Sequence, residues 1–266
     1  MQVLSRFWLV SLVILVLFLA LTVMITPSLA GSQDQVVDKV DDSGPGSLRQ
    51  AIDDVDEGGT ITFDLTYPAT ITLIGGQLVI SKSLTIQGPG AESLTISGND
   101  SSRVFNVTSG TVTISGLTVT GGKTTGTPAY GGGIRNVAVL TLRQVTVEGN
   151  RALANPSSPA GGGGIINMGS LTLDECSILN NAAWGGSGQP ASTGGGLAIG
   201  GGILNLSGST VTVQGSSIEG NLARAGDDPD DDDGGTATGG GLYNAANATL
   251  VVENSTIVSN TAQGGD

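Results

Sequence analysis

A glycine-rich hexapeptide recurs four times in the second half of this 266-residue chain. The copies read GGGIRN, GGGIIN, GGGILN and GGGLYN, and they end at Asn136, Asn167, Asn205 and Asn244, at steps of 31, 38 and 39 residues. Self-similarity with a period between about 20 and 50 residues indicates an architecture of stacked repeats. The repeat therefore constrains the fold more strongly than any single motif does.

Two short apolar segments follow each copy. After GGGIRN come Leu140–Leu142 and Val145–Asn150, and later copies repeat this order; a degenerate copy at 104–122 lacks the glycines. Three short strands per repeat cannot pair within one repeat, but each can pair with its equivalent in the next. The sequence therefore predicts an all-β fold, a right-handed single-stranded parallel β-helix.

Stacking in register turns each equivalent position into a ladder with neighbours about 4.8 Å apart. The predicted inward ladders are Ile134, Ile165, Ile203 and Leu242, and Val119, Val147, Ile178, Ile218 and Ile257; Thr113, Thr141, Thr172 and Thr212 are predicted to face outward. Four corner asparagines are predicted to adopt the left-handed conformation and to stack as an amide ladder: Asn150, Asn181, Asn221 and Asn260. The glycine triplets are predicted to form the opposite corner.

Residues 1–30 have the pattern of a secretory signal peptide. Arg6 precedes a long uncharged apolar run, and Ser28 and Ala30 occupy the small-residue positions expected before a cleavage site. Because roughly 18 apolar residues can span a bilayer, retention of this segment as an anchor is the alternative.

The rest of the chain divides into a cap and a solenoid. Residues 31–58 are predicted to form an N-terminal cap with a short helix that begins after Ser47. This helix places Leu48, Ala51, Ile52 and Val55 on one face. Residues 59–266 are predicted to form the β-helix coils; with no capping element apparent after the last coil, a continuation of the chain or a partner is expected there.

The charge balance restricts the possible partners. The chain carries 23 Asp and Glu against 10 Lys and Arg, a net charge of −13. Such a chain repels nucleic acid and anionic lipid, so no nucleic-acid partner is predicted, and membrane contact is expected only through residues 1–30. The sequence contains no His, the commonest general base, and its single Cys cannot form an internal disulfide.

The cap and the repeats carry a family resemblance. GSLRQAI at 46–52, then GGTITF and KSLTIQGPGAESLTISGN at 82–99, resemble the start of bacterial exported β-helix proteins whose cap motif is written CSLREAI; here Gly46 replaces the Cys and Gln50 the Glu. The GGGI and VEGN or IEGN units are similar to the GGAI and FxxN repeats of chlamydial polymorphic outer-membrane proteins, with Val or Ile where those often have Phe. The resemblance implies the pectate-lyase-like fold, export and an adhesin-like or autotransporter-passenger role, although that wider fold includes enzymes.

One outward ladder bears on catalysis: Ser115, Arg143, Asp174, Gln214 and Glu253. A β-helix polysaccharide lyase would need clustered acids that bind calcium and a nearby Arg or Lys as base. Arg143 and Asp174 are predicted to meet on adjacent coils, and a surface ion pair is the favoured interpretation.

Segments 151–161, 182–199 and 222–238 are interpreted as insertions that emerge along one edge, often the binding face of a repeat protein. The last holds a candidate calcium loop, Asp227, Asp228, Asp230, Asp231, Asp232 and Asp233. Pro229 breaks the register of an EF-hand-like loop, so a solvated acidic loop is the alternative.

Three further features have competing interpretations. Trp184 could stack on a sugar, but burial at a corner is favoured. Cys176 shares a predicted ladder with Leu117, Val145, Ser216 and Ser255 and is interpreted as a core thiol rather than a nucleophile. The Thr ladder admits an ice- or crystal-binding face, which Val251 interrupts.

The sequence thus predicts a secreted or cell-surface module of a bacterium, extracellular or on the outer membrane, with an adhesin-like, non-catalytic role. The expected partner is a carbohydrate or a protein on a host or neighbouring cell, and no cofactor is predicted apart from calcium at the acidic run. The alternative is a polysaccharide lyase or glycoside hydrolase of the pectate-lyase-like fold.

Overall fold

The computed structural model describes residues 33–188, 194–228 and 234–266. Its strands form five sheets in which every neighbouring pair is parallel, and successive coils stack as a right-handed parallel β-helix. The predicted fold class is therefore confirmed. The predicted signal peptide at 1–30 lies outside the described residues.

Three of the five sheets enclose the main core and are called the body here. The first sheet contains β1 (Gln35–Val37), β2 (Thr60–Phe63), β5 (Leu84–Gln87), β8 (Thr111–Ser115), β13 (Val139–Arg143), β18 (Ser170–Asp174), β23 (Thr210–Gln214) and β28 (Thr249–Glu253). The second contains β3 (Ala69–Thr72), β6 (Leu94–Ser97), β9 (Thr118–Thr120), β14 (Thr146–Glu148), β19 (Ser177–Leu179), β24 (Ser217–Glu219) and β29 (Thr256–Val258). The third contains β4 (Leu78–Ile80), β7 (Phe105–Val107), β12 (Ile134–Asn136), β17 (Ile165–Asn167), β22 (Ile203–Asn205) and β27 (Leu242–Asn244).

The inward ladders of the body follow the predicted register. Ile134 pairs with Ile165, which pairs with Ile203, and all three are fully buried. Val147 and Ile178 are likewise paired and fully buried. Each such side chain contributes about 1.5–3 kcal/mol through burial, so the ladders form a continuous hydrophobic core.

The outward threonine ladder is also in the predicted register. Thr141 pairs with Thr113 and Thr172, and Thr172 pairs with Thr212. These side chains are half-buried, and the ladder ends at the exposed Val251.

The predicted capping helix is present as α2 (Leu48–Asp54). The Ser47 hydroxyl accepts a hydrogen bond from the Gln50 N–H at 3.2 Å, which satisfies one of the helix's free amides. Leu48, Ala51, Ile52 and Val55 are buried and belong to the same hydrophobic core as the coils. Strand β1, within the predicted cap region, adds an edge to the first sheet beside β2.

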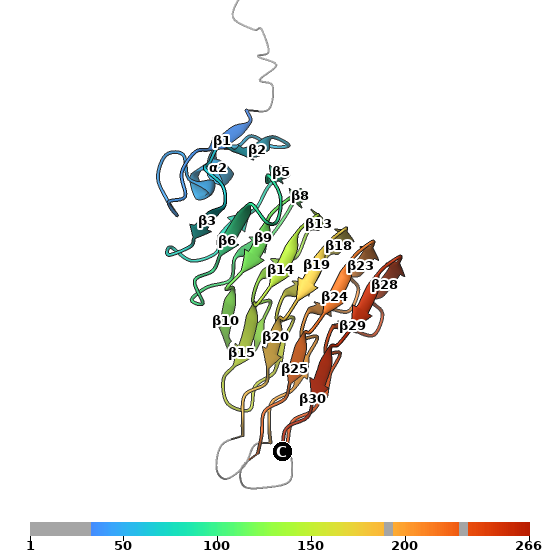
Figure 1. Cartoon of the computed structure of the whole chain (residues 1–266). Helices are drawn as coiled ribbons and strands as arrows, with labels where there is room; N and C mark the ends of the chain where they lie inside the picture. Colours follow the sequence, from blue (N-terminus) through green and yellow to red (C-terminus); the bar gives the residue numbers. More distant parts are fainter. Residues whose placement is uncertain (1–32, 189–193, 229–233) are drawn as a thin grey trace, which may run out of the picture. The chain divides into compact units, whose positions relative to one another are not determined.

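The predicted number of strands per repeat is wrong for the later coils, because the described parts of the supposed insertions contain strands. They form two further sheets, called the wing here. The outgoing sheet contains β10 (Lys123–Gly126), β15 (Arg151–Ala154), β20 (Ala182–Trp184), β25 (Leu222–Arg224) and β30 (Thr261–Gln263); the return sheet contains β11 (Ala129–Tyr130), β16 (Ala160–Gly161), β21 (Ala198–Ile199) and β26 (Ala237–Thr238). Figure 1 shows the outgoing strands as a second row beside β9, β14, β19, β24 and β29.

Small side chains fill the space between the two wing sheets. Ala152, Ala160 and Ala183 are fully buried in one cluster, and Ala198 and Ala223 are fully buried in another. Cα atoms of the outgoing and return strands approach within 8 Å, closer than the roughly 10 Å between ordinary packed sheets. The wing is therefore a thin double layer built on alanine.

The glycine triplets lie where the return strands re-enter the body. The first glycine of each triplet has a left-handed φ, +67° at Gly131 and +56° at Gly162, which other residues resist. The second has no room for a side chain: a Cβ on Gly163 would overlap the carbonyl oxygens of Ala182 and Gly201. The third lies against the corner amide, as Gly164 does against Asn181. The place where the wing joins the body is called the neck here. The triplet is needed because the backbones of the outgoing and return chains are in contact at the neck.

The corner asparagines form the predicted ladder but do not take the predicted backbone conformation. The left-handed residue is the one before each asparagine, such as Gly149 (φ +63°) and Gly220 (φ +65°). With the turn made one residue earlier, the side-chain amides of Asn150, Asn181 and Asn221 are buried and face the next coil. Each Nδ2 donates to the Oδ1 of the following asparagine, at 3.0, 3.0 and 2.9 Å along the series Asn150, Asn181, Asn221 and Asn260.

A second asparagine ladder was not predicted. It joins the asparagines that end the four glycine-rich hexapeptides, with Nδ2–Oδ1 distances of 2.8, 2.8 and 2.7 Å along Asn136, Asn167, Asn205 and Asn244. Its first three members are fully buried. Both ladders replace water with coil-to-coil hydrogen bonds, so these buried amides stabilise the stack rather than weaken it.

The last described coil is more exposed than those before it. Val252 is 41% exposed and Ile257 45% exposed, although their ladder neighbours Val213 and Ile218 are fully buried. Ile257 keeps the predicted ladder position beside Ile218, but its side chain is exposed because no described coil stacks on its other side. That a continuation or a partner covers this edge stays a prediction.

Candidate functional site

The outward face of the outgoing wing sheet presents a ladder of dissimilar side chains. Leu153 pairs with Trp184, Trp184 with Arg224 and Arg224 with Gln263. Successive side chains along a strand point to opposite faces, and the inward positions are taken by Ala152, Ala183 and Ala223, all fully buried, and by Ala262. The remaining positions must therefore face outward.

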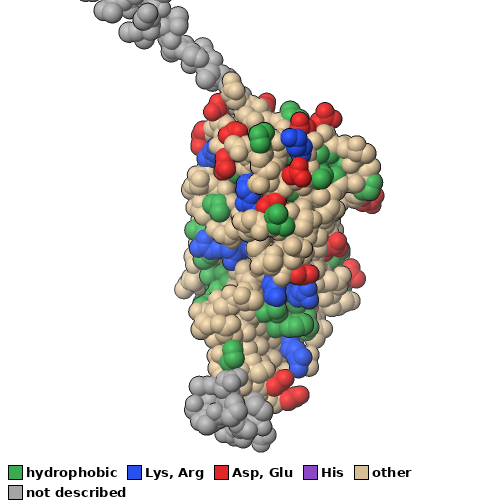
Figure 2. All heavy atoms as spheres, turned by 90° about the vertical axis from the view of Figure 1, so that its left-hand side faces the viewer, with side chains coloured by type: hydrophobic (Ala, Val, Ile, Leu, Met, Phe, Trp, Pro, Cys, Tyr) green, Lys and Arg blue, Asp and Glu red, His purple; other side chains and the backbone are tan. Residues whose placement is uncertain are grey.

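Trp184 is exposed, which corrects the prediction that it is buried. Its side chain leaves 41% of the residue accessible, because Ala183 and not Trp184 occupies the inward position of β20. Within the described residues its indole N–H has no hydrogen-bond acceptor. Figure 2 shows green side chains flanked by blue and red ones in the lower part of the view, where the wing lies. An exposed indole of this kind offers a flat apolar face and one free donor.

Arg224 and Asp227 complete the polar part of this site. The Arg224 Nη2 lies 3.1 Å from Asp227 Oδ2, and both side chains remain partly exposed, at 45% and 40%. Together with Trp184 and Ser187 they line a shallow cavity of about 120 Å³. The site therefore places a charged donor and a charged acceptor beside an aromatic face.

A chain of glycine hydrogen bonds fixes the backbone next to this cavity. The Gly196 N–H donates to the Gly186 carbonyl at 2.8 Å, and the Gly226 N–H donates to Gly196 at 2.9 Å. The Gly235 N–H then donates to Gly226 at 2.9 Å, so the bonds cross alternately between the outgoing and return chains. A Cβ on any of these glycines would overlap a backbone atom of the neighbouring coil. Direct backbone contact therefore holds the site, without a large hydrophobic core beneath it.

The predicted calcium loop is only partly within the described residues. Asp227 and Asp228 are described, and Asp230, Asp231, Asp232 and Asp233 lie outside the described ranges. Asp227 is engaged by Arg224 and by the Asp266 N–H, whose nitrogen is 3.3 Å from Asp227 Oδ1. Within the described ranges no three Asp, Glu or Cys side chains lie close enough together to hold a metal ion. Calcium binding by this run stays a prediction.

The outward ladder on the body has the predicted order, with Arg143 between Ser115 and Asp174. The Arg143 Nε lies 3.5 Å from Asp174 Oδ2, and the two side chains are 62% and 31% exposed. An ion pair so open to solvent is worth under about 1 kcal/mol. Arg143 and Asp174 therefore meet on adjacent coils and form a solvent-exposed ion pair, as predicted.

Cys176 occupies the predicted core position. It is buried, its backbone N–H donates to the Ser216 hydroxyl at 2.9 Å, and its thiol lies against the Leu142 carbonyl. Burial raises the pKa of the Cys176 thiol to about 11, so the thiol stays protonated at neutral pH. A nucleophilic cysteine needs the opposite shift.

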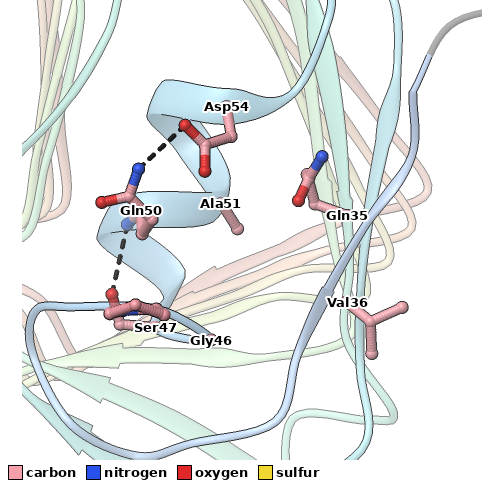
Figure 3. Close-up of a pocket in the computed structure, with 8 residues that line it drawn as sticks. Gln35, Val36, Gly46, Ser47, Gln50, Ala51 and Asp54 are labelled. Carbon is pink, nitrogen blue, oxygen red and sulfur yellow. Dashed lines mark hydrogen bonds between the residues drawn. The ribbon is translucent and has the colours of Figure 1, made fainter.

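A larger cavity, of about 340 Å³, lies between β1 and α2. Figure 3 shows Gln35 on one side of it and Gln50 with Asp54 on the other. The Gln50 Nε2 already donates to Asp54 Oδ1 at 2.8 Å. Because these polar groups satisfy each other and no aromatic is among the described residues that line the space, the wing site is the stronger candidate.

Sequence reasoning missed Arg224 as a site residue, although a signal was present. Each corner asparagine is followed by the same alternation, Arg-Ala-Leu, Ala-Ala-Trp, Leu-Ala-Arg or Thr-Ala-Gln. The alanine of each triplet faces the layer opposite, and the residue after it faces solvent. Aligning these triplets would have placed Trp184 and Arg224 side by side.

Comparisons of the chain with protein-family models, with curated proteins and with solved structures found no match. In the part of the chain that the structure describes, no helix is both long enough and apolar enough to cross a membrane.

Proposed function

We propose that this chain is an exported, non-catalytic binding module of adhesin-like type that acts at the cell surface or outside the cell. The observation that carries the proposal is the wing. The two coils β2–β3–β4 and β5–β6–β7 close around the core with three strands each, so the later coils do not need wing strands to bury the core. Elements added to successive repeats on one side of a solenoid often form its binding face.

The character of the wing face supports a binding role. Aromatic and Arg side chains are enriched where proteins make contact with partners, and here Trp184 and Arg224 are neighbours on a hydrogen-bonded sheet. A rigid sheet loses little conformational entropy when it binds, which favours recognition. The likeness of GSLRQAI and the GGGI repeats to exported bacterial β-helix proteins supports the extracellular location.

The test is a binding assay with the full chain. Labelled protein is incubated with bacterial cells, animal cells and insoluble polysaccharides, and the bound fraction is measured by sedimentation. We expect saturable binding to at least one of these surfaces. Failure to bind any surface would overturn the proposal.

The same samples separate binding from catalysis. Released reducing sugar and the ultraviolet absorbance of unsaturated uronates are measured in parallel. Cleavage products that accumulate with time would replace this proposal with the polysaccharide lyase or glycoside hydrolase alternative. A calorimetric calcium titration in the same buffer would show whether the run from Asp227 to Asp233 binds the ion.

A further inference from the structure

We propose that the Trp184–Arg224–Asp227 face of the wing binds a neutral saccharide. This inference rests on the proposed binding function and adds the site and the chemical class of the ligand. It starts from the pairing of β20 with β25, which places Trp184 beside Arg224 on the outward face. Neighbouring strands lie about 4.8 Å apart, so one small ring can contact both side chains.

The aromatic part of the site suits one face of a sugar. A pyranose has an apolar face of C–H groups and a rim of hydroxyls. The Trp184 indole is 41% exposed beside the cavity, and its N–H is free to donate within the described part of the chain. An aromatic with one apolar face and one polar atom matches such a ligand.

The polar part of the site suits the hydroxyl rim. Each sugar hydroxyl can donate one hydrogen bond and accept others. Arg224 supplies donors and Asp227 supplies acceptors, and these two groups are held 3.1 Å apart at the edge of the cavity. Hydrogen bonds that involve charged groups are stronger than those between neutral groups, so this pair can orient a hydroxyl ligand.

The charge around the site selects against an anionic saccharide. The Asp266 N–H donates to Asp227, and the Asp228 N–H donates to the Asp266 carbonyl at 2.9 Å, so three acidic residues gather near one arginine. Arg224 is itself paired with Asp227. The local field is therefore negative, and a uronate or a sulfated sugar would be repelled.

The size of the site sets the expected strength. A cavity of about 120 Å³ holds a single ring, well below the roughly 300–1,000 Å³ of pockets for drug-sized ligands. We expect a dissociation constant in the millimolar range for one monosaccharide. A polysaccharide would bind more tightly than a monosaccharide, because it presents many copies of the sugar unit to the site.

The experiment titrates the full chain with neutral oligosaccharides of glucose, mannose, galactose and xylose. Oligogalacturonate is the anionic probe. The sequence contains two tryptophans, Trp8 and Trp184, so a Trp8→Phe background makes Trp184 the reporter of its own environment. Calorimetry and tryptophan fluorescence are read in parallel, and we expect at least one neutral oligosaccharide to give both signals.

The variants separate this site from the rest of the wing. Trp184→Ala should weaken binding at least tenfold, and Asp227→Asn about three- to tenfold. Leu153→Ala is the matched control, because Leu153 is the ladder neighbour of Trp184 but does not line the cavity. It should leave binding unchanged. Circular dichroism should show the same fold for all three, since the altered side chains are on the surface.

Two results would overturn the inference and leave the proposed function in place. One is binding of the chain to cells or polysaccharides that Trp184→Ala does not weaken. The other is preference for oligogalacturonate over every neutral oligosaccharide. If the unaltered chain binds none of the tested surfaces, the proposed function itself is overturned.

Discussion

The body and the wing stack through the same parallel register, but they are filled differently. In the body, side chains such as Ile178 and Leu173 fill the interior; in the wing, Ala183 and backbone glycines such as Gly186 occupy the equivalent space. A buried CH₂ group contributes about 0.8 kcal/mol, so each wing layer gains much less from burial than each body layer. The wing must therefore be ordered mainly by hydrogen bonds between coils and by its attachment to the body. This difference allows a coil to carry a thin display surface without a second hydrophobic core.

The largest expected effect is at the junction between the two regions. Asn181→Ala removes the amide that accepts from Asn150 and donates to the Val147 carbonyl at 2.9 Å and to Asn221. Each buried group left without a partner costs about 1–3 kcal/mol, so we expect a loss of about 4 kcal/mol in the free energy of unfolding. Chemical denaturation measures it.

Asn260→Ala is the matched control, because Asn260 ends the same ladder and is only partly buried. Its expected cost is about 1 kcal/mol. Equal costs for the two variants would show that the ladder does not join body and wing.

The second comparison sets a cavity in the body against overpacking in the wing. Ile178→Ala should lower the free energy of unfolding by about 3 kcal/mol, because it leaves a cavity among fully buried neighbours. Ala183→Leu should lower it by about 2 kcal/mol, since the thin double layer has no space for the added atoms. A neutral Ala183→Leu would mean that the wing sheets are not packed together.

The third comparison separates two reasons for glycine. Gly163→Ala at the neck places a Cβ against the Ala182 and Gly201 carbonyls and should cost about 2 kcal/mol. Gly208→Ala in the body has open space but a φ of +79°, and should cost about 1 kcal/mol. Thermal unfolding of the two variants gives the difference. If Gly208→Ala proved the more costly, close contact at the neck would not be the reason for the triplets.

A smaller effect comes from the thiol in the body. The folded-state pKa of Cys176, about 11, lies above the ordinary value of 9.0 because the thiol is buried. The protonated thiol therefore contributes its full stability below pH 9, and this contribution is lost as the pH rises from 9 towards 11. Unfolding measured from pH 7 to pH 10 should show about 1 kcal/mol more loss in the unaltered chain than in Cys176→Ala. Parallel pH profiles would contradict the burial of a protonated thiol.

The sequence was sufficient to predict the body, because its ladders alternate large apolar and polar residues. Ile134, Ile165 and Ile203 could be aligned directly from the glycine-rich hexapeptides. The wing could not be recognised in the same way. Its inward residues are alanines, and glycines such as Gly186 and Gly226 follow its outgoing strands, a composition that is also typical of loops.

The candidate site was predicted only in part for the same reason. The sequence allows Trp184 to be a sugar contact or a buried corner residue, and it cannot exclude burial until Ala183 is known to occupy the inward position of β20. Arg224 could not be placed beside Trp184, because their pairing depends on wing strands whose existence was not predicted. Once the strand register is known, both placements follow from alternation along a strand.

The central claim is that the wing is a folded part of each later coil, and hydrogen exchange tests it most directly. The Ala182 N–H donates to the Asn150 carbonyl at 2.9 Å, and the Leu222 N–H donates to Asn181 at 2.9 Å, so the wing amides are bonded as in the body. We predict that exchange of β20 and β25 is slowed to within about tenfold of their body neighbours β19 and β24. Exchange of the wing strands at the rate of an unstructured peptide, while β19 and β24 remain protected, would contradict the claim.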